Sequence, residues 1–446
     1  MFHDLTHGNI TKSLLLFALP MMAGNLLQQF YNIADTIIVG RILGENALAA
    51  VGSAYTLMTF LTSIFIGLSL GSGALFSIYR GKQDQPAVRS SIFHAFVLIM
   101  GVTLLLNALV YLFLNPILTF LRVPANVWDG MRQYLLIIFA GLIASALYNF
   151  FACMLRALGN STVPLVFLAV SSILNIALDL LFVAVFSWGI AGAAFATIIA
   201  QYASAIGITA YVLLGCRSVL PSRSELQFDR QILKSIGRLS SMTCIQQSVM
   251  NFGILMVQGL VNSFGSTVMA AFAAAVKIDT FAYLPVQDFG NAYSTFIAQN
   301  YGANDRERIR QGTRKAFLLA ICFCLVISAA VVIFAAPLMQ IFVSAKETSI
   351  IASGVWYLRI EGACYCGIGC LFLLYGYYRA VNRAEISLVL TVISLGLRVA
   401  LAYILSPFLG ETGIWLAIPI GWVMADLAGL LGMRRKPATD HSKSNT

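Results

Sequence analysis

The sequence predicts an all-α polytopic membrane protein with twelve transmembrane helices in two six-helix lobes, related by a pseudo-twofold axis along the membrane normal. Its composition, a succession of long apolar segments and an internal repeat support this prediction. The chain of 446 residues is 59% hydrophobic and 10% charged, with a mean hydropathy of +0.85. Soluble domains average about 25% charged residues, so this composition excludes an ordinary soluble protein.

The apolar segments are each about 20 residues or longer, enough to cross a hydrocarbon layer about 30 Å thick. The first contains Pro20 and Asp35 and ends without a small-residue cleavage pattern, so we interpret it as a span and not as a cleaved signal peptide. We expect the twelve spans at residues 13–40, 48–76, 91–115, 133–156, 163–187, 189–214, 236–262, 267–298, 316–337, 350–378, 386–408 and 413–433.

The basic residues predict the orientation in the membrane. If the N-terminus is cytoplasmic, the large majority of the 28 Lys and Arg residues fall in cytoplasmic loops, as the positive-inside rule requires. Both termini are then cytoplasmic. We expect a monomeric, multi-pass protein of the cytoplasmic (inner) membrane, in contact with the lipid bilayer. Because the loops account for the net charge of +10, no nucleic-acid partner is expected.

The two halves of the chain repeat each other. The equivalent residues lie at a nearly constant separation: Ala49-Ala50 and Ala270-Ala271, Gly81 and Gly302, Asp84 and Asp305, Pro116 and Pro337, Arg156 and Arg379, Gly189 and Gly413. We expect an N-terminal six-helix lobe at 1–214, a cytoplasmic linker at 215–235 and a C-terminal six-helix lobe with a short cytoplasmic tail at 236–446. Since each half has an even number of spans, both share one orientation, which places the symmetry axis along the membrane normal.

Asp35 is an acid inside the first apolar segment. A carboxylate at the centre of a membrane helix costs about 2.5–3.5 kcal/mol on insertion scales and usually serves a function. Gln28-Gln29 corresponds to Gln246-Gln247, which places Gly253 opposite Asp35. An acid that the shared fold required would recur in both halves, so Asp35 favours a function of the first half alone.

Asn175 and Asp179 on the fifth span lie one helical turn apart on the same face. If Asp35 approaches Asp179, the two carboxylates cannot both ionise cheaply, and one is expected to hold a proton. Carboxylate, amide and hydroxyl oxygens are also the ligands that a hard cation such as Na⁺ accepts. These residues predict a proton or sodium site in the first half. The alternative is a buried polar network that only tightens helix packing.

The ordered set of features resembles the multidrug and toxic compound extrusion (MATE) transporters over essentially the full chain. It comprises the twelve spans in two parallel halves, the first-span residues Pro20, Gln28, Tyr31 and Asp35, the fifth-span pair Asn175 and Asp179, and Gly189–Ala194 at the start of the sixth span. The resemblance implies a secondary active transporter that exports small organic, often cationic, compounds by H⁺ or Na⁺ antiport through alternating access. No cofactor other than this coupling ion is implied.

The resemblance also implies roles for individual residues. The cation-coupling residues would be Asp35, Asn175, Asp179 and Thr197, with Na⁺ held at Asp35 and Asp179 if sodium is the ion. The supporting polar network would be Gln28, Tyr31 and Asn149, and the first helix would bend at Pro20 when the acid is protonated. Some members carry further acids in the seventh and tenth helices. Here the seventh span has none and the tenth has only Glu361, near its expected outer end, so a second Na⁺ site of that type is not expected.

Several other residues are candidates for the wall of a central substrate cavity. Lys277, Asp279 and Asp288 lie on the eighth span, and they either select charged substrates or form a polar seam between the lobes. Met250 and Met256 could provide an adaptable apolar surface, although packing and lipid contact are commoner roles for methionine.

Other classes of protein fit less well. The four histidines lie at or beyond span ends, so there is no H-E-x-x-H zinc site, and no G-x-S-x-G motif occurs; we expect no enzyme activity. The eight cysteines lack C-x-x-C spacing, and no metal role is expected. A channel usually needs equivalent subunits or pore-lining rings. The second candidate is a flippase or exporter of a lipid-linked or other amphipathic cargo, which would need several basic residues in the central cavity.

Overall fold

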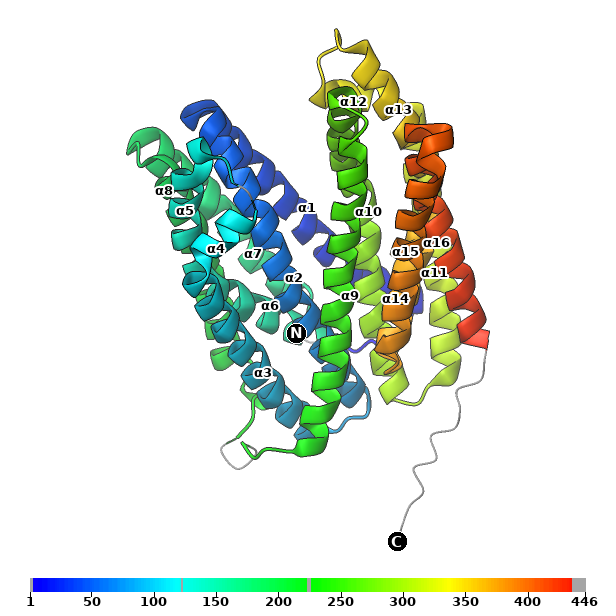
Figure 1. The fold of residues 1–446 in the computed structure, drawn as a ribbon. Coiled ribbons are helices and arrows are strands. Elements are labelled where there is room, and N and C mark those ends of the chain that lie inside the picture. Colours follow the sequence, from blue (N-terminus) through cyan, green and yellow to red (C-terminus); the bar gives the residue numbers. More distant parts are fainter. Residues whose placement is uncertain (1–2, 122, 223–225, 435–446) are drawn as a thin grey trace.

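The computed structural model describes residues 3–121, 123–222 and 226–434, and within these ranges every regular element is helical (Figure 1). The longer helices are α1 (Ile10–Leu43), α2 (Glu45–Gly81), α3 (Gln85–Leu112), α5 (Ala125–Ile138), α6 (Leu142–Ala157), α7 (Thr162–Asp179), α8 (Gly189–Gly215), α9 (Arg230–Asn262), α10 (Ser266–Gly302), α11 (Arg306–Ile333), α13 (Thr348–Gly362), α14 (Tyr365–Ala380), α15 (Ala384–Leu409) and α16 (Glu411–Arg434). The short elements are α4 (Leu114–Phe120), α12 (Ala335–Phe342), η1 (Phe139–Gly141), η2 (Leu180–Val185) and η3 (Arg217–Val219).

Within the described residues, eleven helical segments are long and apolar enough to cross a membrane, and the pair α13–α14 makes a twelfth span that is bent by 50°. The predicted all-α fold with twelve spans is confirmed. Several spans differ in detail from the sequence-based expectation. The third runs from Gln85 to Leu112 and the ninth from Arg306 to Ile333, and the separate short helices α4 and α12 follow them. The fourth begins at Ala125, and the tenth is broken between Gly362 and Tyr365.

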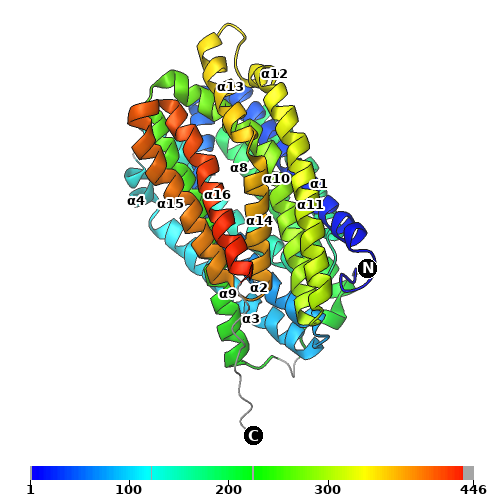
Figure 2. The ribbon, with the colours of Figure 1, turned by 90° about the vertical axis from the view of Figure 1, so that its right-hand side faces the viewer.

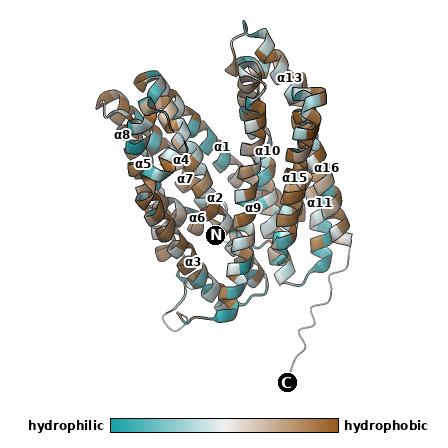
Figure 3. Cartoon of the chain, in the orientation of Figure 1, coloured by the Kyte–Doolittle hydropathy of each residue, from teal (hydrophilic) through white to brown (hydrophobic). Residues whose placement is uncertain are grey.

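Helices α2–α8 form a first bundle and α9–α16 a second. Figure 1 shows that the ribbons of the two bundles come together at one end and spread apart at the other, and Figure 2, turned by 90°, has the second bundle toward the viewer. We name the joined end, which carries the turns Lys82–Asp84, Leu158–Ser161, Ala303–Asp305 and Val381–Arg383, the basic end. Hydrophobic residues predominate along most of the helices, and hydrophilic residues are found toward both ends, including this one (Figure 3).

The internal repeat is visible in the local geometry of the basic end. Gln83 and Asn304 are equivalent residues, and both adopt a left-handed backbone, with φ of 58° and 57°. The next residues, Asp84 and Asp305, each cap the following helix by accepting a hydrogen bond from the backbone N–H three residues later, at 3.1 and 2.9 Å. Such side-chain caps satisfy one of the free N–H groups of a helix start. The same turn is therefore built twice.

Glycines allow the two bundles to approach closely near the basic end. A Cβ atom at Gly67 of α2 would lie 2.5 Å from the Cα of Cys244 on α9, and one at Gly71 would lie 2.5 Å from the Cα of Ser240. Real Cβ atoms do not approach backbone this closely. The Ser72 and Ser240 hydroxyls also meet across this contact at 2.9 Å. The junction of the bundles thus depends on small residues.

Helix α1 contacts both bundles. Its first half packs through Leu14, Phe17 and Met21 into a cluster formed chiefly by α10 and α11 of the second bundle. From Gly24 onward it also packs on α7 of the first bundle, where a Cβ at Gly24 would meet Leu168 at 3.4 Å, while Asn25 and Phe30 still contact α10. Pro20 lies just before the contacts with the first bundle begin, a point that we call the crossover, and the helix continues through it. Residues 3–21, assigned by the sequence analysis to the N-terminal lobe, thus pack largely against the second bundle.

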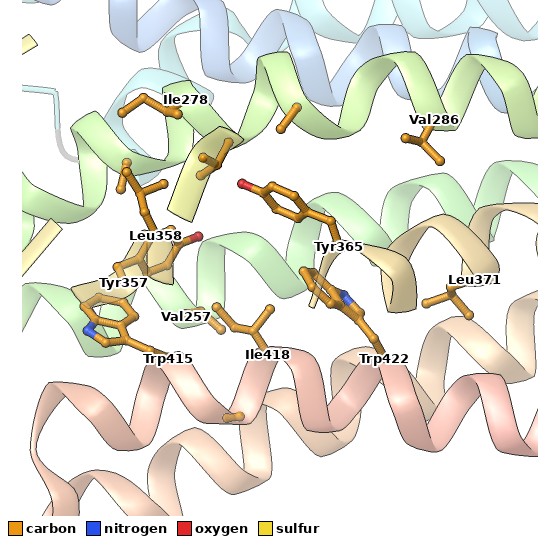
Figure 4. Close-up of a cluster of buried hydrophobic side chains, with 14 of the residues drawn as sticks. Val257, Ile278, Val286, Tyr357, Leu358, Tyr365, Leu371, Trp415, Ile418 and Trp422 are labelled. Atoms are coloured by element: carbon orange, nitrogen blue, oxygen red, sulfur yellow. The ribbon is translucent and has the colours of Figure 1, made fainter. Parts of the chain in front are cut away.

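The core of the second bundle is aromatic. Trp415 of α16 stacks on Phe272 of α10 with ring centroids 5.5 Å apart, and Tyr357 of α13 meets Trp415 edge-on at 4.8 Å. Figure 4 shows Tyr357, Trp415 and Tyr365 among the aliphatic side chains of this cluster. These contacts hold the broken span α13–α14 against α10 and α16.

Candidate cation-coupling site

Asp35 and Asp179 come together between α1 and α7. Asp179 is the last residue of α7 and is fully buried, and the carboxyl group of Asp35 lies close enough to interact with it electrostatically. One turn earlier on α7, Asn175 donates from Nδ2 to Thr197 Oγ1 of α8 at 3.5 Å. The structure therefore gathers the four predicted coupling residues, Asp35, Asn175, Asp179 and Thr197, at one place in the first bundle.

The oxygens of this group lack donors. Asp35 Oδ1, both carboxylate oxygens of Asp179 and Asn175 Oδ1 are buried without a hydrogen-bond donor from the described residues. A buried acceptor left without a partner costs about 1–3 kcal/mol, and more when it is charged. Two ionised carboxylates that lie beside each other also repel. The arrangement therefore favours a shared proton or a bound hard cation, for which carboxylate and amide oxygens are suitable ligands.

The backbone widens directly after Asp179. Helix α7 ends there and continues as the π-helical segment η2, whose last turn leads to a Phe182–Trp188 ring stack with centroids 4.6 Å apart. Single π-helical turns inside α-helices are rare and frequently mark functional sites. Here the wider turn follows the buried acid immediately.

Tyrosines surround the acid pair. Tyr31, one turn before Asp35 on α1, lies near Gln28, and both acids lie within electrostatic range of its hydroxyl. Tyr134 of α5 is 7% exposed and lies near Thr197 and both acids. Sequence analysis missed Tyr134, because a tyrosine within an apolar span carries no signal that separates a site residue from a packing residue.

Asn149, the third member of the predicted supporting network, lies on α6 and donates from Nδ2 to the Ser145 carbonyl of its own helix at 2.8 Å. The amide of Asn149 is therefore hydrogen-bonded within its own helix. Pro20 lies 15 residues before Asp35 on α1, about 22 Å along the helix. Any influence of Pro20 on the acid pair must therefore pass through the helix itself.

In the second bundle, the position equivalent to Asp35 has apolar surroundings. Gly253, the equivalent of Asp35, lies against Leu395, and a Cβ there would come within 2.9 Å of that side chain. The second bundle has its own buried acids elsewhere. Asp279 of α10 accepts a hydrogen bond from Tyr365, and Glu361 of α13 and Arg398 of α15 lie beside it.

This placement differs from the sequence-based expectation for two residues. Asp279, a candidate for the cavity wall, is 2% exposed inside the second bundle. Glu361, expected near an outer end, is 6% exposed next to the break between α13 and α14. Sequence analysis missed this pair because the break in the tenth span, which turns Glu361 inward, leaves no clear mark in the sequence.

The remaining cavity candidates are dispersed. Lys277 is exposed, and its ammonium group lies 6.0 Å from the centroid of the Phe342 ring. Met250 packs against the core of the second bundle, whereas Met256 is 40% exposed. Asp288 is buried and accepts a hydrogen bond from Asn25 Nδ2 of α1 at 2.6 Å. Of this set, Asp288 joins α1 to the second bundle.

Comparison with known proteins agrees with this architecture. A family model described as MatE matches residues 20–181 and 240–404. The Bacillus subtilis protein named "Probable multidrug resistance protein YpnP" is 32% identical over 435 residues, 97% of this chain and 96% of its own length. The protein named "FAD transporter" of Shewanella oneidensis is 24% identical over 439 residues, 96% of this chain and 95% of its own.

Solved structures show the same fold. One described as the outward-facing conformation of a multidrug resistance MATE family transporter of the MOP superfamily superposes with a TM-score of 0.92 at 23% identity, covering 97% of this chain and 98% of that one. Together with the match of the family model to both halves, this identifies the chain as a member of the MatE family, the multidrug and toxic compound extrusion proteins, and thus as a multi-pass membrane transporter and not an enzyme.

Proposed function

We propose that this protein is a secondary active multidrug efflux transporter that exports small organic, often cationic, compounds by H⁺ or Na⁺ antiport. The observation that carries the proposal is the pairing of the half-buried Asp35 with the buried Asp179, three of whose four oxygens are buried without a donor among the described residues. The printed name of the YpnP relative supports the class of cargo. We further propose that the basic end faces the cytoplasm, with both termini on that side of the cytoplasmic (inner) membrane, and that the protein works as a monomer.

The coupling step would take place at the acid pair. A proton or Na⁺ that enters from the outside binds between Asp35 and Asp179, aided by Asn175 and Thr197, and removes the repulsion between the carboxylates. Helix α1 then repacks against α7, and substrate is released outward. Loss of the ion on the cytoplasmic side resets the pair.

Helix α1 can transmit this change to the whole molecule, because its first half packs on the second bundle and its second half contacts both. Pro20 at the crossover removes one backbone hydrogen bond, which makes it the weakest point of the helix. We propose that α1 bends there while the lobes at 1–214 and 236–446 rock about the glycine contacts, with 215–235 as the linker. The bundles, joined at the basic end and spread at the other, would represent the outward-open state.

Either H⁺ or Na⁺ could supply the free energy for export. One elementary charge that moves through 100 mV is worth about 2.3 kcal/mol. Exchange of one H⁺ or Na⁺ for one monovalent organic cation is electroneutral, so only the chemical gradient of the ion drives it. A second ion per cycle would add the voltage, and the two carboxylates provide room for it.

The alternative cargo, a lipid-linked or other amphipathic molecule, requires cationic side chains in the central space. Lys277, a predicted cavity residue, lies over Phe342, and Arg398 lies beside the buried acids of the second bundle, so neither supplies that charge. Arg156 and Arg379 do lie between the bundles, but as two residues of a small cavity near the basic end and not as an extended basic lining. We therefore favour export of small organic molecules.

Reconstitution separates these possibilities. Purified protein in proteoliposomes is given a fluorescent organic cation, and a pH gradient and a Na⁺ gradient are imposed in separate experiments at zero membrane potential. We expect one gradient to drive uphill movement of the dye in wild-type protein. If neither gradient moves the dye although the protein is inserted and monodisperse, the proposed function is wrong.

A further inference from the structure

A small cavity lies between the two bundles near the basic end. Its volume is about 20 Å³, enough for roughly one water-sized group. Side chains from α1, α2 and α6 line one side and side chains from α10 and α14 the other. Two arginines reach it, Arg156 from the end of α6 and Arg379 from the end of α14. These arginines are equivalent residues of the two halves, so the cavity lies at the pseudo-twofold axis.

The repeat makes the walls of the cavity comparable residue by residue. Asn291 and Ser294 of α10 line one side, and the equivalent residues of α2, Leu70 and Gly73, line the other. Arg379 is 6% exposed and donates to Asn291 Oδ1 at 2.8 Å and to Ser294 Oγ at 3.3 Å. Its hydrogen bonds to these residues are to neutral acceptors.

Arg156 lacks the corresponding acceptors. The residues that would serve it by symmetry are Leu70 and Gly73, which have no side-chain oxygen. Accordingly, Arg156 Nε is buried without a hydrogen-bond partner among the described residues. The asymmetry of the repeat leaves this guanidinium group incompletely satisfied and directed toward the cavity.

The cavity therefore has an excess of positive charge. Arg156 and Arg379 are the charged residues of its wall, and the carboxylate that acts on Arg156 electrostatically is Asp288, which already accepts from Asn25. Buried charge is costly unless it is paired. Guanidinium groups bind carboxylate and phosphate with two parallel hydrogen bonds, which makes an organic anion the matching partner.

We propose that Arg156 and Arg379 form an anion-binding site that receives the carboxylate or phosphate group of a substrate arriving from the basic end. The proposal rests on the export function above, in which this end faces the cytoplasm and opens when the bundles separate. The cavity is then the innermost part of the transport path. Organic anions, and zwitterions that carry such a group, then join the cations in the substrate range.

The test compares two dyes that differ in one group, a rhodamine free acid and its methyl ester. Both share the cationic ring system, and only the acid carries a carboxylate. In proteoliposomes, Arg156→Gln and Arg379→Gln should each raise the KM for the acid about 10- to 100-fold, the loss expected for a charged hydrogen bond, and leave that for the ester unchanged. Arg156→Lys keeps the positive charge but not the two parallel donors of the guanidinium group, so it should raise the KM for the acid less than Arg156→Gln does.

Arg314→Gln is the matched control, because Arg314 is an exposed residue of α11 and its loss changes the net charge equally. Gel filtration checks that each variant is folded. If Arg379→Gln fails this check, Arg156→Gln carries the test, since its guanidinium has fewer partners to lose. Equal effects of the arginine variants on acid and ester, or no effect on either, would overturn the proposal.

Direct binding separates this site from the transport function. Fluorescence titration of the purified full-length protein with the free acid should show an affinity that depends on Arg156 and Arg379, even in a preparation that moves neither dye. Transport failure with this binding intact rejects the export function and leaves the site. If inorganic phosphate displaces the acid at concentrations similar to the acid itself, the site takes a free anion and the assignment to a substrate group is wrong.

Discussion

Gly81 of α2 and Gly302 of α10, equivalent residues of the two halves, each lie against the backbone of the other's helix. A Cβ at Gly81 would overlap the carbonyl oxygen of Gln299, and one at Gly302 would overlap that of Ile78. Gln299 and Ile78 are themselves equivalent positions, so the contact is symmetric. It closes the basic end of the molecule directly on the pseudo-twofold axis.

Gly81→Ala should therefore loosen this closure. The added methyl group cannot be accommodated without moving backbone, which typically costs about 1–3 kcal/mol. Cys153, a buried residue that lines the nearby cavity, reports the change when the other cysteines are replaced by alanine. We expect a membrane-impermeant maleimide added at the basic end to label Cys153 faster in the variant. Gly237→Ala is the control, because a Cβ at Gly237 meets open space, and its Cys153 should be labelled at the rate of the protein without either glycine substitution. Equal labelling rates in that protein, Gly81→Ala and Gly237→Ala would refute the role of the contact.

The N-terminal segment, residues 3–9, ties the bundles together at the same end. Arg308 of α11 donates to the carbonyls of His7 at 2.8 Å, Gly8 at 2.9 Å and Leu5 at 3.2 Å, while His3 N–H donates to Gly159 of the first bundle at 2.9 Å. Arg308→Gln should speed hydrogen exchange of the Leu5 amide about tenfold or more, because hydrogen bonds from a charged donor contribute about 1.5–3 kcal/mol. Unchanged exchange in Arg308→Gln, or equal acceleration in the exposed-residue variant Arg314→Gln, would contradict this fastening role.

Pro20→Ala tests the proposed hinge. Alanine restores the backbone donor that proline lacks, which should stabilise the helix by up to about 3 kcal/mol. If bending at Pro20 is part of the cycle, thermal stability should rise while the rate of dye efflux falls and dye binding is retained. Pro407→Ala, near the end of α15, is the control and should keep its efflux rate. An efflux rate in Pro20→Ala equal to that of wild type would rule out the hinge.

Tyr134→Phe tests the residue that the sequence did not reveal. Loss of the hydroxyl removes a polar neighbour of Thr197 and of the acid pair. We expect the concentration of the coupling ion at half-maximal efflux to shift by about 5- to 15-fold, the size of one neutral polar interaction. Tyr202→Phe, whose hydroxyl donates to the Ala140 carbonyl away from the acids, is the matched control. A shift of equal size in both variants would remove Tyr134 from the site.

The sequence predicts what local patterns encode. The span positions follow from hydropathy, and the two halves follow from equivalent pairs such as Gly81 and Gly302. The pairing of Asp35 with Asp179 follows from the rarity of acids in apolar helices and from the family resemblance. Contacts between distant segments have no such pattern. The approach of Tyr134 to Thr197, the inward turn of Glu361 at a broken span and the crossover of α1 at Pro20 depend on packing that only the folded chain defines.

The central claim is that the Asp35–Asp179 pair couples an ion gradient to export, and Asp35→Asn in proteoliposomes tests it most directly. The amide is isosteric and cannot release a proton or hold Na⁺ by charge. We predict that the variant inserts and binds the dye but no longer moves it uphill under the gradient that drives wild-type protein, whereas Asp129→Asn, at an exposed position on α5, remains active. Gradient-driven efflux by Asp35→Asn at the wild-type rate would contradict the account.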